Sequence, residues 1–208
     1  GASTVTNTAR DITKRTSIGA QRNPASEDAI LTAAAEILTE GGLSAFSIEA
    51  VARRAKAGKP TIYRWWPSKA ALLLDVYHRQ KGETFYPDTG ATRGDLIAFL
   101  EALLGFWKTS GGEVFRSIVA EAQSDPAALE ALRDYAVTRC RASGVILERG
   151  VARGEIRGTL DIPLIMELFS SFCWQRLLTG RLDPSRAQVT HLVDAVLTGF
   201  ATERNGAQ

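Results

Sequence analysis

The sequence contains few of the residues from which metal sites are built. Its two cysteines, Cys140 and Cys173, form no C-x-x-C pair, and its only histidines are His78 and His191. Structural and catalytic zinc sites need three or four such ligands close together. Metal catalysis through His and Cys is therefore nearly excluded, and we expect neither a metal nor a cofactor.

The sequence also lacks long apolar runs and catalytic signatures. No uninterrupted stretch of about 18 apolar residues occurs, which excludes a membrane-spanning helix. No apolar stretch of the signal-peptide kind stands near the N-terminus, so we expect a cytoplasmic protein with no membrane partner. The nucleophile elbow, P-loop, dinucleotide fingerprint and paired-histidine motif are all absent, so we expect no enzymatic activity.

What is present is the composition of a folded chain. The 208 residues are 45% hydrophobic and 23% charged, which is close to the average for soluble globular proteins. This length corresponds to one large domain or two small ones, enough for a substantial core.

Apolar residues recur with helical spacing along the chain, and no convincing strand appears. The sequence therefore predicts an all-α fold of about nine helices. Ser26 and the pairs Asp125-Pro126 and Asp183-Pro184 are interpreted as helix starts, and Gly41-Gly42 and Gly111-Gly112 as helix ends. The expected helices cover about 27–40, 47–55, 59–66, 68–80, 93–109, 113–123, 126–153, a segment around 162–173 and a segment around 189–200.

The two halves of the chain carry opposite net charge. Residues 1–81 hold 12 Lys and Arg against 7 Asp and Glu, whereas residues 82–208 hold 13 against 16. No carboxylate occurs between Glu49 and Asp75, although six cations lie there. This basic patch is either a solvated helical face or a binding site for a polyanion.

Residues 47–77 have the layout of a helix-turn-helix, in which the second helix enters the DNA major groove. Here the chain resembles the TetR/AcrR family of bacterial transcriptional regulators. The resemblance rests on AFSIEAVARRAKAGKPTIYRWWPSKAALLLDVY, residues 45–77, and above all on the run from Lys59 to Lys69. It implies a helix-turn-helix DNA-binding domain over residues 23–81, preceded by a flexible basic arm over 1–22, and a helical effector-binding and dimerisation domain over 82–208.

The resemblance assigns DNA contacts to the recognition helix. Thr61 and Tyr63 place hydroxyls on its exposed side, where they reach phosphates or bases; the alternative for Tyr63 is a half-buried core ring. Lys59 and Pro60 lie at the tip of the helix, nearest the groove floor. Lys69 matches a family lysine that clamps a phosphate at the start of the fourth helix.

Other residues of the motif have structural or open interpretations. Ile62 and Trp66 fall on the opposite side and are expected in the core. Ser47 caps the second helix and also touches a phosphate. Arg64 and Trp65 either follow the DNA backbone or cover the domain surface.

The turn departs from the family pattern at two positions. Lys56 stands where the family usually has glycine, and Gly58 replaces the usual capping serine or threonine. If the turn demands a positive φ at Lys56, the strain is on the order of 1 kcal/mol.

For the second half, the resemblance implies a homodimer formed through the last two helices and a pocket for a small apolar or aromatic effector. Aromatic and apolar residues there suit such a pocket, although each is also explained as ordinary core. Two arginines, Arg139 and Arg176, could anchor an acidic group or simply face water. The candidate pocket residues are Phe99, Leu103, Phe106, Trp107, Phe115, Tyr135, Met166, Phe169, Phe172, Trp174 and Arg176.

Three hypotheses follow from the sequence. The first is a repressor that binds a pseudo-palindromic double-stranded operator as a homodimer and is released by an effector. The second is a regulator of the same fold that has no small-molecule effector or acts as an activator. The third is an unrelated helical binding protein or enzyme whose basic patch only aids solubility.

Overall fold

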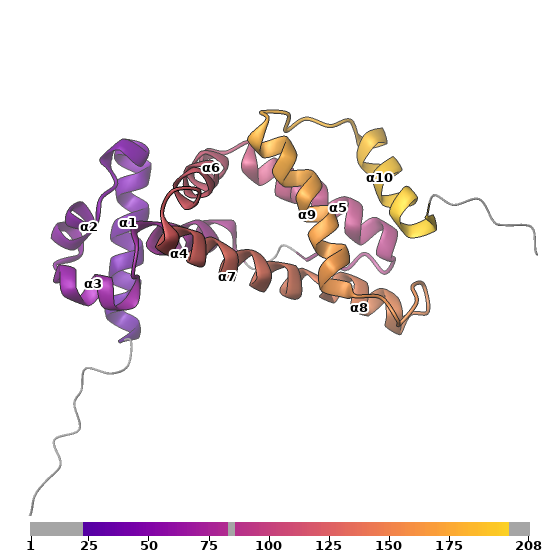
Figure 1. Ribbon diagram of the computed structural model, residues 1–208, viewed down its shortest axis with the longest axis horizontal. Helices are drawn as coiled ribbons and strands as arrows, with labels where there is room; N and C mark the ends of the chain where they lie inside the picture. The colour runs from indigo at the N-terminus through magenta and orange to yellow at the C-terminus, as the bar shows by residue number, and fades with distance from the viewer. Residues whose placement is uncertain (1–22, 83–85, 200–208) are drawn as a thin grey trace, which may run out of the picture.

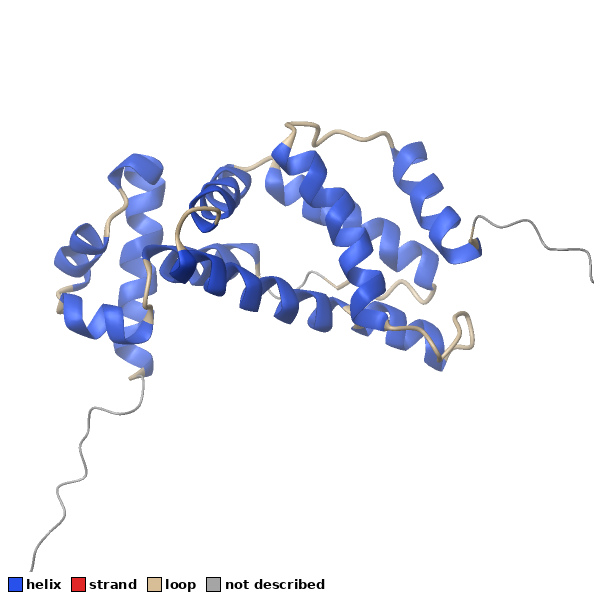
Figure 2. Cartoon of the chain, in the orientation of Figure 1, coloured by secondary structure: helices blue, strands red, loops and turns tan. Residues whose placement is uncertain are grey.

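The computed structural model describes residues 23–82 and 86–199, and every regular element in these ranges is a helix (Figures 1 and 2). The predicted all-α class is confirmed. Within these residues no helix is long and apolar enough to cross a membrane. The predicted arm, residues 1–22, and Phe200 of the last predicted helix lie outside the described residues. The helices are α1 Pro24–Ala45, α2 Ile48–Ala55, α3 Lys59–Trp65, α4 Lys69–Lys81, α5 Thr92–Trp107, α6 Ser110–Ala122, α7 Pro126–Ser143, α8 Val145–Ala152, α9 Ile162–Leu178 and α10 Arg186–Thr198.

The helices form two groups joined by α4. Helices α1, α2 and α3 gather at one end of the molecule, and α5 to α10 make up the larger body (Figure 1). Helix α4 packs against α1 on one side and against α6 and α7 on the other. It is therefore part of both groups.

The first helix is longer than predicted at both ends. Asn23, not Ser26, is its N-cap, and its side chain accepts a hydrogen bond from the Ala25 backbone N–H at 3.1 Å. Pro24 follows in the first turn, where a proline lacks only an N–H that would have no helical partner. The predicted stop at Gly41-Gly42 is a kink, since Gly42 has φ 66° and helical residues continue to Ala45.

The pair Gly111-Gly112, interpreted from the sequence as a helix end, instead begins the next helix. Thr109 is the cap of α6, and both glycines are buried in its first turn. A Cβ on Gly111 would lie 2.5 Å from the Phe106 ring, and one on Gly112 would collide with the Trp107 carbonyl oxygen. These glycines let α6 start directly against the end of α5.

Two further boundaries differ from the prediction. The helix expected over 126–153 is divided into α7 and α8 at Gly144, where a Cβ would lie 2.8 Å from Ile162. The last helix starts after Ser185, which forms a capping box with Gln188, and not at Asp183-Pro184. In this capping box two backbone N–H groups are satisfied at once, so it competes well with an Asp-Pro start.

An aromatic cluster fixes the end of α4 in the larger body. Phe115 of α6 stacks on Tyr77 of α4 at 4.9 Å and on Trp107 of α5 at 5.4 Å between ring centroids. Trp174 of α9 meets Phe115 edge-on at 5.2 Å, and Tyr135 of α7 lies 6.3 Å away. Rings from four other helices thus meet at the buried side chain of Phe115.

Candidate nucleic-acid interface and pocket

The turn between α2 and α3 is built around a left-handed residue. Lys56 ends α2 with φ 53° and ψ 39°, and it is the only non-glycine residue with positive φ among those described. The Ala57 N–H then donates to the Ala52 carbonyl at 3.0 Å, which closes the helix end. Gly58 caps α3 without a side-chain hydrogen bond. Both departures from the family pattern therefore occur in a motif that keeps its shape.

Helix α3 has one buried face and one exposed face. Ile62 and Trp66 are buried, as predicted, and the Trp66 Nε1–H donates to Asp75 Oδ2 at 2.6 Å. Tyr63 is 46% exposed, which excludes the alternative of a core ring. Of the other predicted DNA contacts, Lys59, Pro60, Arg64 and Lys69 are exposed, and Ser47, Thr61 and Trp65 are half-buried.

The start of α2 and the start of α3 are brought together by an ion pair. Lys59 Nζ lies 3.3 Å from Glu49 Oε1, and Glu49 follows Ser47 by two residues. A hydrogen bond from its own backbone N–H, and then the one from Lys59, lower the pKa of Glu49. Both side chains are about half exposed, so water and salt screen the pair, and Lys59 can exchange Glu49 for another anion.

Two serines fix the helix starts on this surface. The Ser47 hydroxyl accepts from the Ala50 N–H at 3.0 Å, and the Ser68 hydroxyl accepts from the Ala71 N–H at 3.1 Å. Lys69, the first residue of α4, is exposed beside this second cap. This places an ammonium at the positive end of a helix, where an anion is favoured.

Not every cation of the basic patch is available. Arg54 is bound to helix α1, with its Nη2 2.6 Å from Glu40 Oε2 and its Nη1 3.6 Å from Glu36 Oε2. These two ion pairs link α2 to α1.

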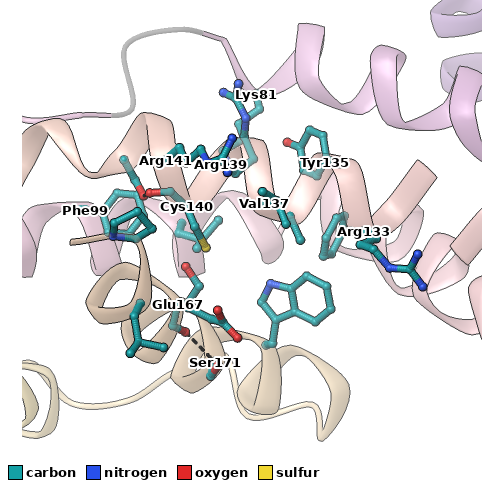
Figure 3. Close-up of a pocket in the computed structure, with 18 of the residues that line it drawn as sticks. Lys81, Phe99, Arg133, Tyr135, Val137, Arg139, Cys140, Arg141, Glu167 and Ser171 are labelled. Carbon is teal, nitrogen blue, oxygen red and sulfur yellow. Dashed lines mark hydrogen bonds between the residues drawn. The ribbon is translucent and has the colours of Figure 1, made fainter. Parts of the chain in front are cut away.

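The larger body contains a cavity of about 690 Å³, between α4, α5, α6, α7 and α9. Among the predicted pocket residues, Phe99, Leu103, Trp107, Phe115, Tyr135 and Trp174 line it. Polar side chains also reach its wall, as Figure 3 shows for Lys81, Arg139 and Glu167.

The remaining predicted pocket residues lie elsewhere. Met166 and Phe169 are buried in the core without lining the cavity. Phe106 packs edge-on against Tyr77 at 5.4 Å, and the Arg176 guanidinium lies 4.8 Å from the centroid of the Phe172 ring. None of the five is in the wall of the cavity.

Several lining residues were missed by the sequence interpretation, including Tyr77, Lys81 and Tyr86. Tyr77 and Lys81 are four residues apart in the last turn of α4, a spacing that places them on one helical face. The Trp107 Nε1–H donates to the Tyr77 hydroxyl at 2.7 Å, and burial raises the pKa of Tyr77. Burial likewise raises the pKa of Tyr135, so these phenols are neutral donors and acceptors around the cavity.

Large apolar side chains are exposed on the last two helices. On α9, Leu164, Leu168 and Leu178 are each more than half exposed, and Leu197 of α10 is also exposed. Leu164 and Leu168, one helical turn apart, form a continuous apolar strip. Contiguous exposed apolar side chains are a common feature of surfaces that contact another chain.

Two family profiles match the chain. The profile described as bacterial regulatory proteins, tetR family, matches residues 30–76. The profile described as tetracyclin repressor-like, C-terminal domain, matches residues 86–196. The first range contains the helix-turn-helix. The second contains most of the residues that line the cavity, although Tyr77 and Lys81 of α4 lie outside it.

Individual relatives are similar over most of the chain. The uncharacterised HTH-type transcriptional regulator YdeS of Bacillus subtilis is 33% identical over 186 residues, 88% of this chain and 91% of its own. The DNA-binding transcriptional repressor TetR of Mycobacteroides abscessus is 32% identical over 174 residues, 81% of this chain and 90% of its own. The crystal structure of the TetR family transcription regulator SCO0332 has a TM-score of 0.73 and 31% identity, covering 85% of this chain and 99% of that one.

Proposed function

Because the chain belongs to the TetR family of helix-turn-helix transcriptional regulators, we propose that it is an effector-released repressor acting as a homodimer on a pseudo-palindromic operator. The observation that carries the proposal is the position of α4, which begins on the candidate DNA surface and ends in the wall of the cavity. The relative from Mycobacteroides abscessus is a DNA-binding transcriptional repressor, which supports repression over activation for this chain.

The DNA contacts divide into two kinds. Lys59, Thr61 and Tyr63 on the exposed side of α3 read base edges in the major groove, where their donors meet base acceptors. Lys69, together with the capped start of α4, holds a backbone phosphate. Arg64 and Trp65 flank the helix, and Ser47 approaches phosphate from α2.

Residues 82–208 carry out dimerisation and effector binding in this proposal. The exposed leucines of α9 and α10 pack against the same helices of a second copy, since a two-fold interface uses the same surface on both subunits. Light scattering should then report about twice the chain mass of 22.5 kDa. A monomer at micromolar concentration would exclude this assembly.

The effector acts by binding one geometry of the dimer better than the other, because equal affinity for both states shifts nothing. The cavity is bounded by α4, so its occupation changes how the last turn of α4 packs. Effector and operator must therefore weaken each other by the same factor.

The test begins with selection of preferred duplexes from a random pool by the full-length chain. We expect two half-sites related by two-fold symmetry, with centres about 34 to 36 Å apart or a multiple of that. Binding of all duplexes with equal affinity would contradict the operator assignment. Compounds that release the selected duplex should bind free protein more tightly than the complex, and equal binding to both would contradict the release mechanism.

A further inference from the structure

The wall of the cavity contains an arginine that has no counter-ion among the residues that the structure describes. Arg139 Nη1 donates to the Tyr86 hydroxyl at 3.3 Å, and its guanidinium carbon lies 5.7 Å from the centroid of the Tyr135 ring. Its Nε is buried and has no hydrogen-bond acceptor, and no carboxylate within the described ranges lies at ion-pair distance from Arg139. A buried cationic donor left in this condition is costly unless something else satisfies it.

A second cation reaches the same part of the cavity from another helix. Lys81, at the end of α4, lines the cavity beside Arg139 of α7 (Figure 3). Burial, and then the positive charge of Arg139, lower the pKa of Lys81 to about 8. The two like charges are thus close enough to repel each other in a site of low dielectric.

The rest of the cavity has a different character. Trp107, Phe115 and Trp174 offer aromatic surface to its interior. The two carboxylates that line it belong to the α9 side: Asp161, whose oxygen caps that helix, and Glu167, which faces α7 across the cavity (Figure 3). The α4–α7 end, where Arg139 and Lys81 lie, is therefore the end at which we expect an anion to be favoured.

We propose that the cavity binds an amphipathic anion, with one carboxylate-like or sulfonate-like group between Arg139 and Lys81 and an apolar body against the aromatic wall. This deepens the proposed function, on which it rests, by stating the chemical class of the effector. A planar guanidinium fork donates to two anion oxygens at once, which satisfies the buried Nε–H and adds geometric selectivity. The anion also joins α4 to α7 by exchanging a repulsion between them for a shared attraction.

The probes for the test are two dyes with the same aromatic body. One is 8-anilinonaphthalene-1-sulfonate, an anion, and the other is N-phenyl-1-naphthylamine, which lacks the sulfonate. Both are titrated by fluorescence into the full-length protein and into Arg139→Gln, Trp174→Leu and Arg133→Gln. The last variant is the matched control, because Arg133 also lines the cavity from α7 but is exposed and points away from Arg139 in Figure 3.

We expect the anionic dye to bind the native protein at least about tenfold more tightly than the neutral dye. Arg139→Gln should remove most of this preference and leave the neutral dye within about twofold, while Trp174→Leu should weaken both dyes. Arg133→Gln should change neither dye by more than about twofold. Circular dichroism on each variant verifies native helix content.

Two results would overturn the inference. One is equal affinity for the two dyes in the native protein. The other is an anionic dye whose binding is unchanged by both Arg139→Gln and Trp174→Leu, which would place it outside the cavity. The proposed function fails separately, if no compound that occupies the cavity alters the affinity for the selected duplex.

Discussion

The two ends of α4 each present a lysine, in opposite surroundings. Lys69 begins the helix in contact with water, beside the capping hydroxyl of Ser68. Lys81 ends it in the wall of the cavity, where burial and Arg139 lower its pKa to about 8. The first cation is screened by salt and suited to a phosphate, whereas the second is desolvated and suited to one specific anion. The different surroundings of the two lysines therefore account for the different roles that we propose for them.

The largest effect is expected from breaking the packing that holds the Lys81 end in place. Phe115→Ala removes the ring that contacts Tyr77, Trp107 and Trp174, and buried Phe-to-Ala changes cost about 3 to 5 kcal/mol. Urea denaturation followed by circular dichroism measures the loss. Tyr63→Ala, at the exposed end, should change the free energy of unfolding by no more than about 0.5 kcal/mol. Equal losses would show that the two ends are not packed differently.

The next effect concerns sequence reading near the Lys69 end. Thr61→Ala should reduce the preference for the selected duplex over random DNA by about 1 to 3 kcal/mol, because a lost base contact leaves an acceptor without a partner. Competition binding against random duplex measures this gap. If the difference in affinity between selected and random duplex is unchanged, Thr61 does not contact a base.

A pH titration sharpens the assignment of Lys81. Only its protonated form attracts an anion, so affinity for the sulfonate dye should be full below about pH 7 and fall by up to about tenfold as the pH rises through 8 to 9.5. The sulfonate stays ionised throughout, and Lys81→Met should flatten the profile. A native profile as flat as that of the variant would contradict the assignment. The other titratable groups lining this cavity are Tyr77, Tyr86, Arg133, Tyr135, Arg139, Cys140, Arg141, Asp161 and Glu167.

The three phenols and the thiol among these groups do not imitate the expected profile. Burial raises the pKa of Tyr77, Tyr86, Tyr135 and Cys140 above their ordinary values. The phenols therefore titrate above the range in which Lys81 changes charge. The Cys140 thiol is neutral through most of the pH range in which Lys81 changes charge.

A smaller effect is expected at Lys69 itself. Lys69→Ala should weaken selected and random duplexes alike and reduce the slope of log K against log salt by about one per subunit. Anisotropy titrations at four salt concentrations give the slope. A slope that stays at the native value, with helix content retained, would mean that this ammonium touches no phosphate.

The smallest effect is expected at the ion pair between α2 and α3. Glu49→Gln frees Lys59 from its partner and removes a negative charge from the proposed DNA surface, so affinity for any duplex should rise severalfold. Glu40→Gln, which alters the pair with Arg54 away from α3, is the matched control. Weaker binding in Glu49→Gln would show that Glu49 positions Lys59 for its contacts.

The helix-turn-helix could be predicted in detail because its caps, its turn and its buried positions are determined by residues close together in the sequence. Ser47 caps the helix that it precedes, and Lys56 takes the left-handed conformation that the turn requires. The spacing of Ile62 and Trp66 was enough to place both in the core. Each of these features depends on a few neighbouring residues, so the sequence carried it.

The cavity could be predicted only in part, because it depends on distant packing. Met166 and Phe169 are as apolar as Trp107 and Phe115. The first two are packed in the core, however, whereas Trp107 and Phe115 line the cavity. Periodicity identifies a buried face but does not tell a packed interior from a void. The prediction that Gly111-Gly112 ends a helix was wrong for the same reason. These glycines are needed because residues of the neighbouring helix α5 leave no room for a Cβ at either position.

The length of α4 gives it the properties of a lever. Thirteen residues at about 1.5 Å each make an arm of about 20 Å between Lys81 and Lys69. A tilt of about 10° at the cavity end would displace the other end by about 3.5 Å, close to the rise of one base pair. In a two-fold assembly the two arms move together, so their tips change separation by up to twice that distance. A rearrangement no larger than a side-chain contact would then put the two recognition helices out of phase with the duplex.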